Sequence, residues 1–182
     1  MMGIALFATG DIEQGRDHSD RAFRFYDSAA HRSLGTRFGQ DAGVSILSYR
    51  AYAQWVLGLS YLQKREYEKG IAHLEKAVAS SGNSPRYVAS LGYAFAVAGR
   101  KAEAERGLDK LRGLSKQRYV SPYYTATVYA GTGNAQGALE WLERAYQERD
   151  GWIPYIQSQP EFDGLRSDPG FQALVGRMNF PR

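Results

Sequence analysis

Side chains that could carry out acid–base or metal chemistry gather near the end of the chain. Glu161, Asp163 and Asp168 form a group of carboxylates, a set that can serve proton transfer or bind calcium. Their spacing does not match a calcium-binding loop, and Asp168 precedes Pro169 as the N-cap residue of a helix would. We therefore interpret them as structural, with Asp168 as an N-cap and Asp163 as a cap or turn residue.

A glycine-rich segment gives a second candidate, because residues 125–137 have the outline of a dinucleotide-binding turn. An apolar run is followed by Gly131, Gly133 and Gly137 and then by a helical pattern. The glycine spacing differs from G-x-G-x-x-G, and the sequence contains no second strand–helix–strand unit. We interpret this segment as part of a helical repeat.

Metal and nucleophilic chemistry have little support elsewhere. The chain has no cysteine, which excludes disulfides, thiol nucleophiles and thiolate metal sites. Its three histidines, His18, His31 and His73, are scattered, and the sequence has neither a P-loop nor a nucleophile elbow. We predict no catalytic, cofactor-binding or metal-binding residue, and expect that the protein is not an enzyme.

Composition and charge are those of an ordinary folded protein, with 182 residues, 43% of them hydrophobic, and a net charge of +4. Residues 49–118 carry 13 basic and 6 acidic side chains, a net charge of +7. A basic segment can bind nucleic acid, but interleaved acidic residues favour solvated helices with paired charges. With no apolar run of about 18 residues and no signal-peptide pattern, we expect a cytoplasmic protein without a membrane segment.

Any functional site must be positioned by the helices of this chain, and their sequence pattern repeats every 34 residues. Leu57-Gly58-x-x-Tyr61 recurs as Leu91-Gly92-x-x-Phe95, and a third copy spans 125–129. The second part of each repeat shares small and apolar residues, namely Gly70, Leu74 and Ala77, then Ala104, Leu108 and Leu111, then Ala138, Leu142 and Ala145. Each repeat predicts two amphipathic helices that cross closely at the small residues.

Turn signals stand where these helices should begin and end. Ser84 and Ser121, each followed by proline, predict N-caps, and Gly99 and Gly133 predict positive φ at helix ends. A short helix is expected within 152–157. A last helix from Pro169 to about residue 178, with apolar residues on one stripe, would cap the array.

The pattern resembles the tetratricopeptide repeat (TPR) family, whose 34-residue helix–turn–helix carries W-x2-L-G-x2-Y. Leu57 to Tyr61 matches the L-G-x2-Y part, whereas Gln54, Val88 and Pro122 replace the tryptophan. The stretches 26–58 and 121–171 resemble TPR regions of bacterial multidomain signalling proteins, including those with cyclase or ATPase domains, kinases and transcriptional regulators.

This resemblance implies an all-α, right-handed α-solenoid of antiparallel helix pairs in a single domain, 1–182. Residues 1–48 would be a degenerate N-terminal repeat with an insertion at 27–48, followed by three TPR units at 49–150 and a cap at 151–182. The insertion contains His31, Arg32 and Arg37. It is interpreted either as a connection between two helices or as a functional loop.

The predicted functional surface is a concave groove lined by the first helix of each unit. Apolar residues form two stripes on the helix over 49–62, so one stripe faces something other than its own hairpin. The candidate groove residues are Tyr52, Trp55, Leu59, Arg86, Tyr93 and Tyr123. We expect a non-catalytic scaffold in bacterial signalling or regulation that binds an apolar or amphipathic peptide. The alternatives are a homodimer through the groove or the N-terminal edge, and, less favoured, nucleic-acid binding through the basic segment.

Overall fold

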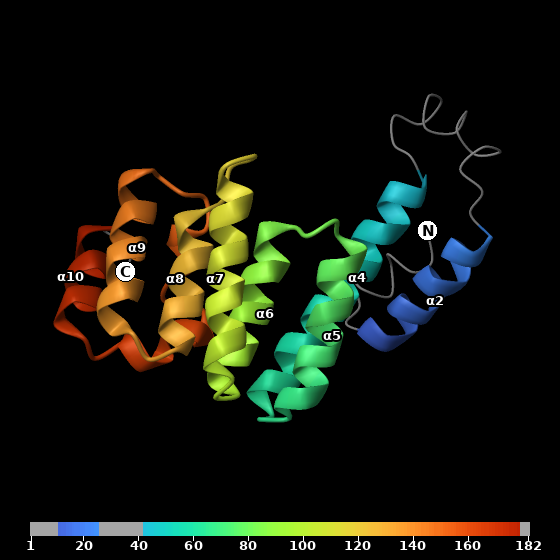
Figure 1. Ribbon diagram of the computed structural model, residues 1–182, viewed down its shortest axis with the longest axis horizontal. Coiled ribbons are helices and arrows are strands. Elements are labelled where there is room, and N and C mark those ends of the chain that lie inside the picture. The colour runs from blue at the N-terminus through green and yellow to red at the C-terminus, as the bar shows by residue number, and fades with distance from the viewer. Residues whose placement is uncertain (1–10, 26–41, 179–182) are drawn as a thin grey trace. The chain divides into compact units, whose positions relative to one another are not determined.

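The computed structural model describes residues 11–25 and 42–178, and this part of the chain contains helices and no strand (Figure 1). The predicted all-α class is therefore confirmed. The α-helices are α2 (Ile12–Arg24), α4 (Ala42–Gln63), α5 (Tyr67–Ser80), α6 (Pro85–Val97), α7 (Lys101–Ser115), α8 (Pro122–Gly131), α9 (Ala135–Gln147) and α10 (Pro169–Arg177). Two 3-10 helices, η1 (Ile153–Tyr155) and η2 (Pro160–Leu165), precede α10.

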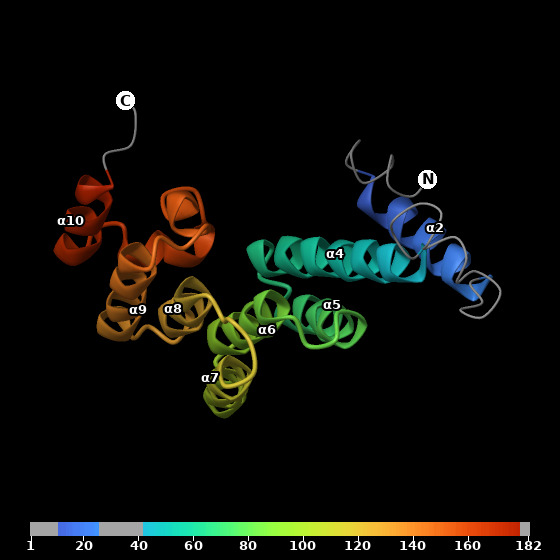
Figure 2. The same ribbon diagram turned by 90° about the horizontal axis from the view of Figure 1, so that it is seen from above.

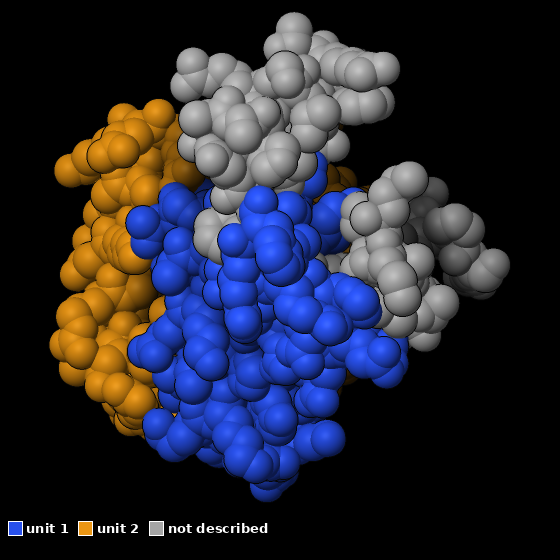
Figure 3. Space-filling model, turned by 90° about the vertical axis from the view of Figure 1, so that its right-hand side faces the viewer, with its two compact units in different colours: residues 1–87 blue, residues 88–182 orange. Residues whose placement is uncertain are grey.

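The chain divides into two compact units, unit 1 (Met1–Tyr87) and unit 2 (Val88–Arg182). Figure 3 colours the two units separately. The division falls in the first turn of α6, so Pro85–Tyr87 belong to unit 1.

The 34-residue repeat is present in the backbone. Helices end at Gln63, Val97 and Gly131, and the next helices begin at Tyr67, Lys101 and Ala135. The connecting turns are alike, because Arg65, Gly99 and Gly133 have φ values of 60°, 76° and 75°. In each turn the amide of the next residue donates to a carbonyl five residues back: Glu66 to Tyr61, Arg100 to Phe95 and Asn134 to Tyr129. The expected positive φ at Gly99 and Gly133 is confirmed.

Unit 1 is built on the close crossing of α4 and α5, which lie side by side in Figures 1 and 2. A Cβ atom on Gly70 would lie 3.0 Å from the carbonyl oxygen of Gly58, so two glycines bring the backbones together, as the sequence predicted. Helix α2 packs on α4, and Asp20 and Arg50 form an ion pair that links them.

The start of α4 differs from the prediction. The sequence placed residues 42–48 in an insertion, but α4 begins at Ala42 and these residues are helical. The 34-residue comparison could not find this start because the other repeats have no matching extension. The rest of the predicted insertion, 27–41 with His31, lies outside the described residues.

In unit 2, α6 and α7 also approach at glycines, but not at the expected pair. The sequence placed Ala104 opposite Gly92, whereas a Cβ atom on Gly107 would lie 3.1 Å from the Cα atom of Gly92. Gly107 escaped notice because residues 34 positions away, His73 and Trp141, are large.

The core of unit 2 joins α8 and α9 to the C-terminal segment. Phe162 of η2, Phe171 and Leu174 of α10 and Leu142 of α9 are buried together. The sequence predicted α10 and its apolar stripe, and predicted a short helix within 152–157, where η1 is found. Helix η2 was not predicted.

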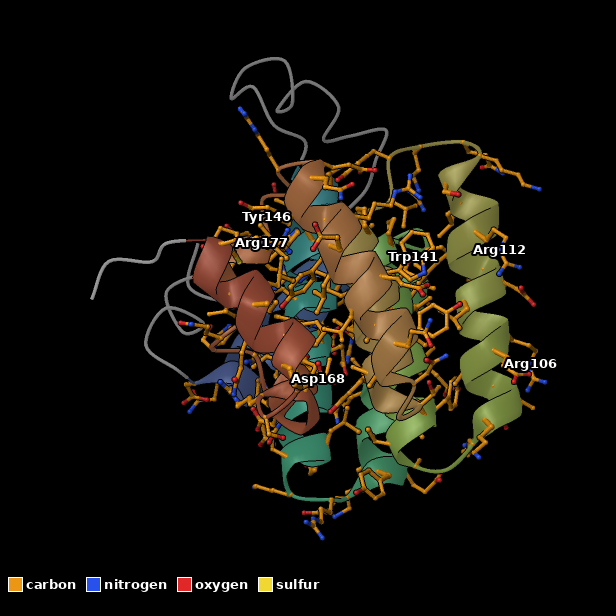
Figure 4. All side chains as sticks on the ribbon, turned by 90° about the vertical axis from the view of Figure 1, so that its left-hand side faces the viewer. Arg106, Arg112, Trp141, Tyr146, Asp168 and Arg177 are labelled. Atoms are coloured by element: carbon orange, nitrogen blue, oxygen red, sulfur yellow. The ribbon has the colours of Figure 1, made fainter. Side chains whose placement is uncertain are left out.

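The ends of α10 are held by side chains. Asp168 accepts hydrogen bonds from the amides of Gly170 (2.7 Å) and Phe171 (3.3 Å), which confirms its role as an N-cap. At the other end, Arg177 pairs with Glu143 of α9, and its guanidinium lies 5.2 Å from the centre of the Tyr146 ring (Figure 4). The pairing with Arg177 lowers the pKa of Glu143 below its usual range.

Candidate functional site

The candidate site is an aromatic cluster in unit 1, where three of the six predicted groove residues meet. Tyr52 and Trp55 lie one turn apart on α4, with ring centres 5.7 Å apart. The guanidinium carbon of Arg86, in the first turn of α6, lies 3.8 Å from the centre of the Trp55 ring. Tyr87 contacts the same indole at 6.2 Å between ring centres. We call these four residues the Trp55 cluster.

The local sequence explains why the cluster forms. Residues three apart on a helix share a face, so Tyr52 and Trp55 project together. Pro85 starts α6 and fixes φ at its first position, which leaves Arg86 and Tyr87 in the first turn of the helix. A guanidinium at this distance over an indole makes a favourable cation–π contact.

The cluster is partly open to solvent. Tyr52 is 39% exposed, while Trp55, Arg86 and Tyr87 are half-buried. Burial raises the pKa of Tyr87 above its usual value, so its hydroxyl is protonated at neutral pH and can donate a hydrogen bond. Large apolar rings, a fixed positive charge and a hydroxyl are thus presented together on one surface.

The other predicted groove residues lie elsewhere. Leu59 is half-buried on α4. In unit 2, Tyr93 is half-buried and lines a hollow of about 360 Å³ together with Gly131 and the acidic residues Glu161 and Asp163.

Tyr123 was expected to line the groove, but the structure places it in the core of unit 2. It is only 5% exposed, and its ring packs edge-on against Phe162 at 5.3 Å between ring centres. Helix η2, which packs on α8 and contributes Phe162, was not predicted from the sequence. Without η2, Tyr123 would lie on an exposed face of α8, and this is why it was assigned to the groove.

Sequence reasoning missed two features. Tyr87 was not singled out, although its position beside Arg86 in the first turn after Pro85 was a usable signal. A pocket in unit 2 with Trp141, Arg112 and Arg144 in its wall was also missed. These residues come from two helices, so no sequence spacing connects them.

The glycine-rich segment does not form a dinucleotide-binding turn. Residues Pro122–Gly131 form α8, a helix rather than the strand that such a turn needs. Gly133 lies in a helix–helix turn of the same kind as those at Arg65 and Gly99. Asp163, a second candidate for chemistry, pairs with Arg166 of the same segment at 2.7 Å. It lies within η2, where its carbonyl oxygen accepts from the amide of Arg166, so the structure fits the predicted turn role rather than the cap.

The basic segment shows paired charges along its helices. Lys69 pairs with Glu66, Arg100 with Glu103, and Arg112 with Asp109, each pair three residues apart. These pairs match the interleaved pattern seen in the sequence, although the expected spacing was four residues.

No protein-family model matches the chain, and no curated protein or solved structure is significantly similar to it. Across residues 11–25 and 42–178, no group of three or more histidine, aspartate or glutamate side chains is placed to hold a metal ion. None of the described helices combines the length and the apolar character needed to cross a membrane.

Proposed function

We propose that this chain is a non-catalytic protein-interaction module that binds an apolar or amphipathic peptide through the Trp55 cluster. The observation that carries the proposal is the stacking of Arg86 on Trp55 beside the exposed ring of Tyr52. Tryptophan, tyrosine and arginine are the residues that most often dominate the free energy of binding at protein interfaces.

The repeated helical hairpins support a TPR-type arrangement as the scaffold of this surface. Three turns with similar positive φ, equivalent hydrogen bonds and a 34-residue spacing agree with that family's repeat. We extend the proposal to a right-handed α-solenoid that acts as a cytoplasmic scaffold in bacterial regulation.

The cluster is suited to an apolar anchor. Arg86 already covers one face of the Trp55 indole, which restricts the ring and lowers the entropy lost when a ligand packs against it. Helix α2 packs on α4 and still leaves part of Tyr52 exposed, so a ligand ring or aliphatic side chain can reach the cluster.

The test is a selection of random dodecapeptides on the full chain, followed by affinity measurements on variants. We expect Trp55→Ala and Tyr52→Ala each to weaken the selected peptides at least tenfold, and Arg86→Gln several-fold. Tyr155→Ala is the matched control, because Tyr155 is 51% exposed and packs on Trp152 at 5.9 Å, much as Tyr52 packs on Trp55.

Two results would overturn the proposal. The first is recovery of no peptide above background. The second is a set of peptides that bind the Trp55→Ala, Tyr52→Ala double variant as tightly as the parent chain. Circular dichroism and light scattering on every variant separate loss of the site from loss of the fold, and reveal self-association that masks the surface.

A further inference from the structure

We propose that unit 2 contains a second binding site, a pocket that takes an aliphatic carboxylate. The pocket lies against α7, α8 and α9 and has a volume of about 110 Å³. Leu108 and Leu111 of α7 and Val120 give it apolar walls, and Trp141 of α9 closes one side. Figure 4 shows Trp141 directed from α9 toward α7. The proposal is independent of the Trp55 cluster, which involves none of these residues.

Two guanidinium groups supply the charge that the ligand must match. Arg112 of α7 and Arg144 of α9 both line the pocket, and the guanidinium carbon of Arg144 lies 5.2 Å from the centre of the Trp141 ring. One positive group thus lies beside the Trp141 ring at the wall of the pocket. Arginine binds carboxylates through two parallel hydrogen bonds, so an acid can engage either group in defined geometry.

The existing partners of these arginines can be displaced. Arg112 pairs with Asp109 at 2.9 Å and Arg144 pairs with Glu148 at 2.7 Å, each between residues on the same helix. Both arginine side chains are more than half exposed, and ion pairs between exposed side chains contribute little free energy. A ligand that also buries an apolar group can therefore compete for the guanidinium groups.

The size of the cavity limits the apolar part of the ligand. A cavity of about 150 Å³ accommodates benzene, so this smaller one suits a branched aliphatic group of four or five carbon atoms. The ligand class is thus a short, branched carboxylic acid. The same chemistry is found in a free acid and in the C-terminal residue of a peptide that ends in leucine or valine.

The experiment is an NMR titration of the full chain that follows the indole N–H signal of Trp141, assigned with Trp141→Phe. N-acetyl-leucine represents the chain end, 4-methylpentanoate the free acid, and N-acetyl-leucinamide lacks the charge. We expect both acids to shift the signal with a Kd of the order of 1 mM, and the amide to bind at least tenfold more weakly. The tighter of the two acids then identifies the source of the carboxylate.

The variant arm uses Arg112→Gln with Arg144→Gln, which should raise the Kd of the better acid at least tenfold. Arg106→Gln is the matched control, because the exposed Arg106 lies on the same helix, pairs with Glu103 and does not line the pocket (Figure 4). Equal binding of acid and amide to the parent chain would overturn the proposal, as would an unchanged Kd in the double variant. Because the amide comparison uses the parent chain, it does not depend on the folding of any variant.

Discussion

The hydroxyl of Tyr119 donates a 2.8 Å hydrogen bond to Oδ2 of Asp150, and so joins the segment before α8 to the turn after α9. Asp150 is only 5% exposed, and its other oxygen accepts from the amide of Trp152 at 2.8 Å. Burial beside this carboxylate, together with the hydrogen bond, raises the pKa of Tyr119 to about 12. Although Tyr119 is largely exposed, its hydroxyl therefore makes a hydrogen bond that holds two segments of unit 2 together.

The first prediction is that Tyr119→Phe destabilises the protein by about 1–3 kcal/mol, because a buried carboxylate loses a donor. Urea titration followed by circular dichroism gives the free energy of unfolding. Tyr155→Phe is the control on another exposed tyrosine and should change it by less than about 0.5 kcal/mol. Equal effects from the two substitutions would mean that the Tyr119–Asp150 bond contributes nothing.

The second prediction contrasts two helical glycines. A Cβ atom on Gly58 would lie 2.6 Å from Cγ of the fully buried Leu74, so Gly58→Ala should destabilise by about 2 kcal/mol or more. A Cβ atom on Gly113 of α7 meets no atom within 4 Å. Gly113→Ala should stabilise by up to about 1 kcal/mol, because alanine favours a helix over glycine. The pair can be measured by thermal and urea unfolding, and a neutral Gly58→Ala would contradict the close crossing of α4 and α5.

Two of the three turns between paired helices could be predicted from the sequence, because glycine is the residue that most readily adopts positive φ. Gly99 and Gly133 were predictable from their 34-residue spacing, and the structure confirms both. Arg65 fills the same position with φ of 60°, and no residue preference indicates this for an arginine. The turn at Arg65 could therefore be predicted from the 34-residue repeat, but not from its own residues.

The sequence predicted three of the four residues of the Trp55 cluster, but not how residues of different helices contact one another. Tyr52 and Trp55 share a face of α4 through helical spacing, and the sequence grouped them correctly. The stacking of Arg86 on Trp55 depends on how α6 begins relative to α4, and the burial of Tyr123 depends on η2. Both depend on tertiary packing between segments far apart in the chain, which periodicity does not encode.

The third prediction compares two residues that precede a proline at the start of a helix. Asp168 accepts hydrogen bonds from two amides of α10, so Asp168→Ala should lower the free energy of unfolding by about 1 kcal/mol. Ser121 holds the same position before α8 but makes no capping hydrogen bond, and within the described part of the chain its buried hydroxyl has no partner.

Ser121→Ala should therefore be neutral or slightly stabilising, because it removes a buried polar group that gains no hydrogen bond. Chemical unfolding of both variants measures the difference. Asp168→Asn keeps an acceptor oxygen and should retain most of the stability lost in Asp168→Ala. A loss of stability in Ser121→Ala equal to that in Asp168→Ala would show that both residues act as caps.

The fourth prediction concerns the pH dependence that His73 gives to unit 1. Its Nδ1 lies 2.6 Å from Oε1 of the buried Gln54, and its ring stacks on Tyr61 at 5.3 Å. Burial lowers the pKa of His73 below 6.5, and the positive charges of Lys76 and Arg16 lower it further, against a smaller opposing effect of Glu13.

The sign of the effect follows from proton counting. Between the lowered pKa of the folded state and the unfolded value near 6.5, the unfolded chain binds more protons than the folded chain. The contribution of His73 to stability is therefore complete above pH 6.5 and is lost as the pH falls below that value. Free energies of unfolding at pH 7.5 and 5.5 should differ less in His73→Asn than in the parent chain. If His73→Asn retained the full pH dependence, burial against Gln54 and Tyr61 would not be its cause.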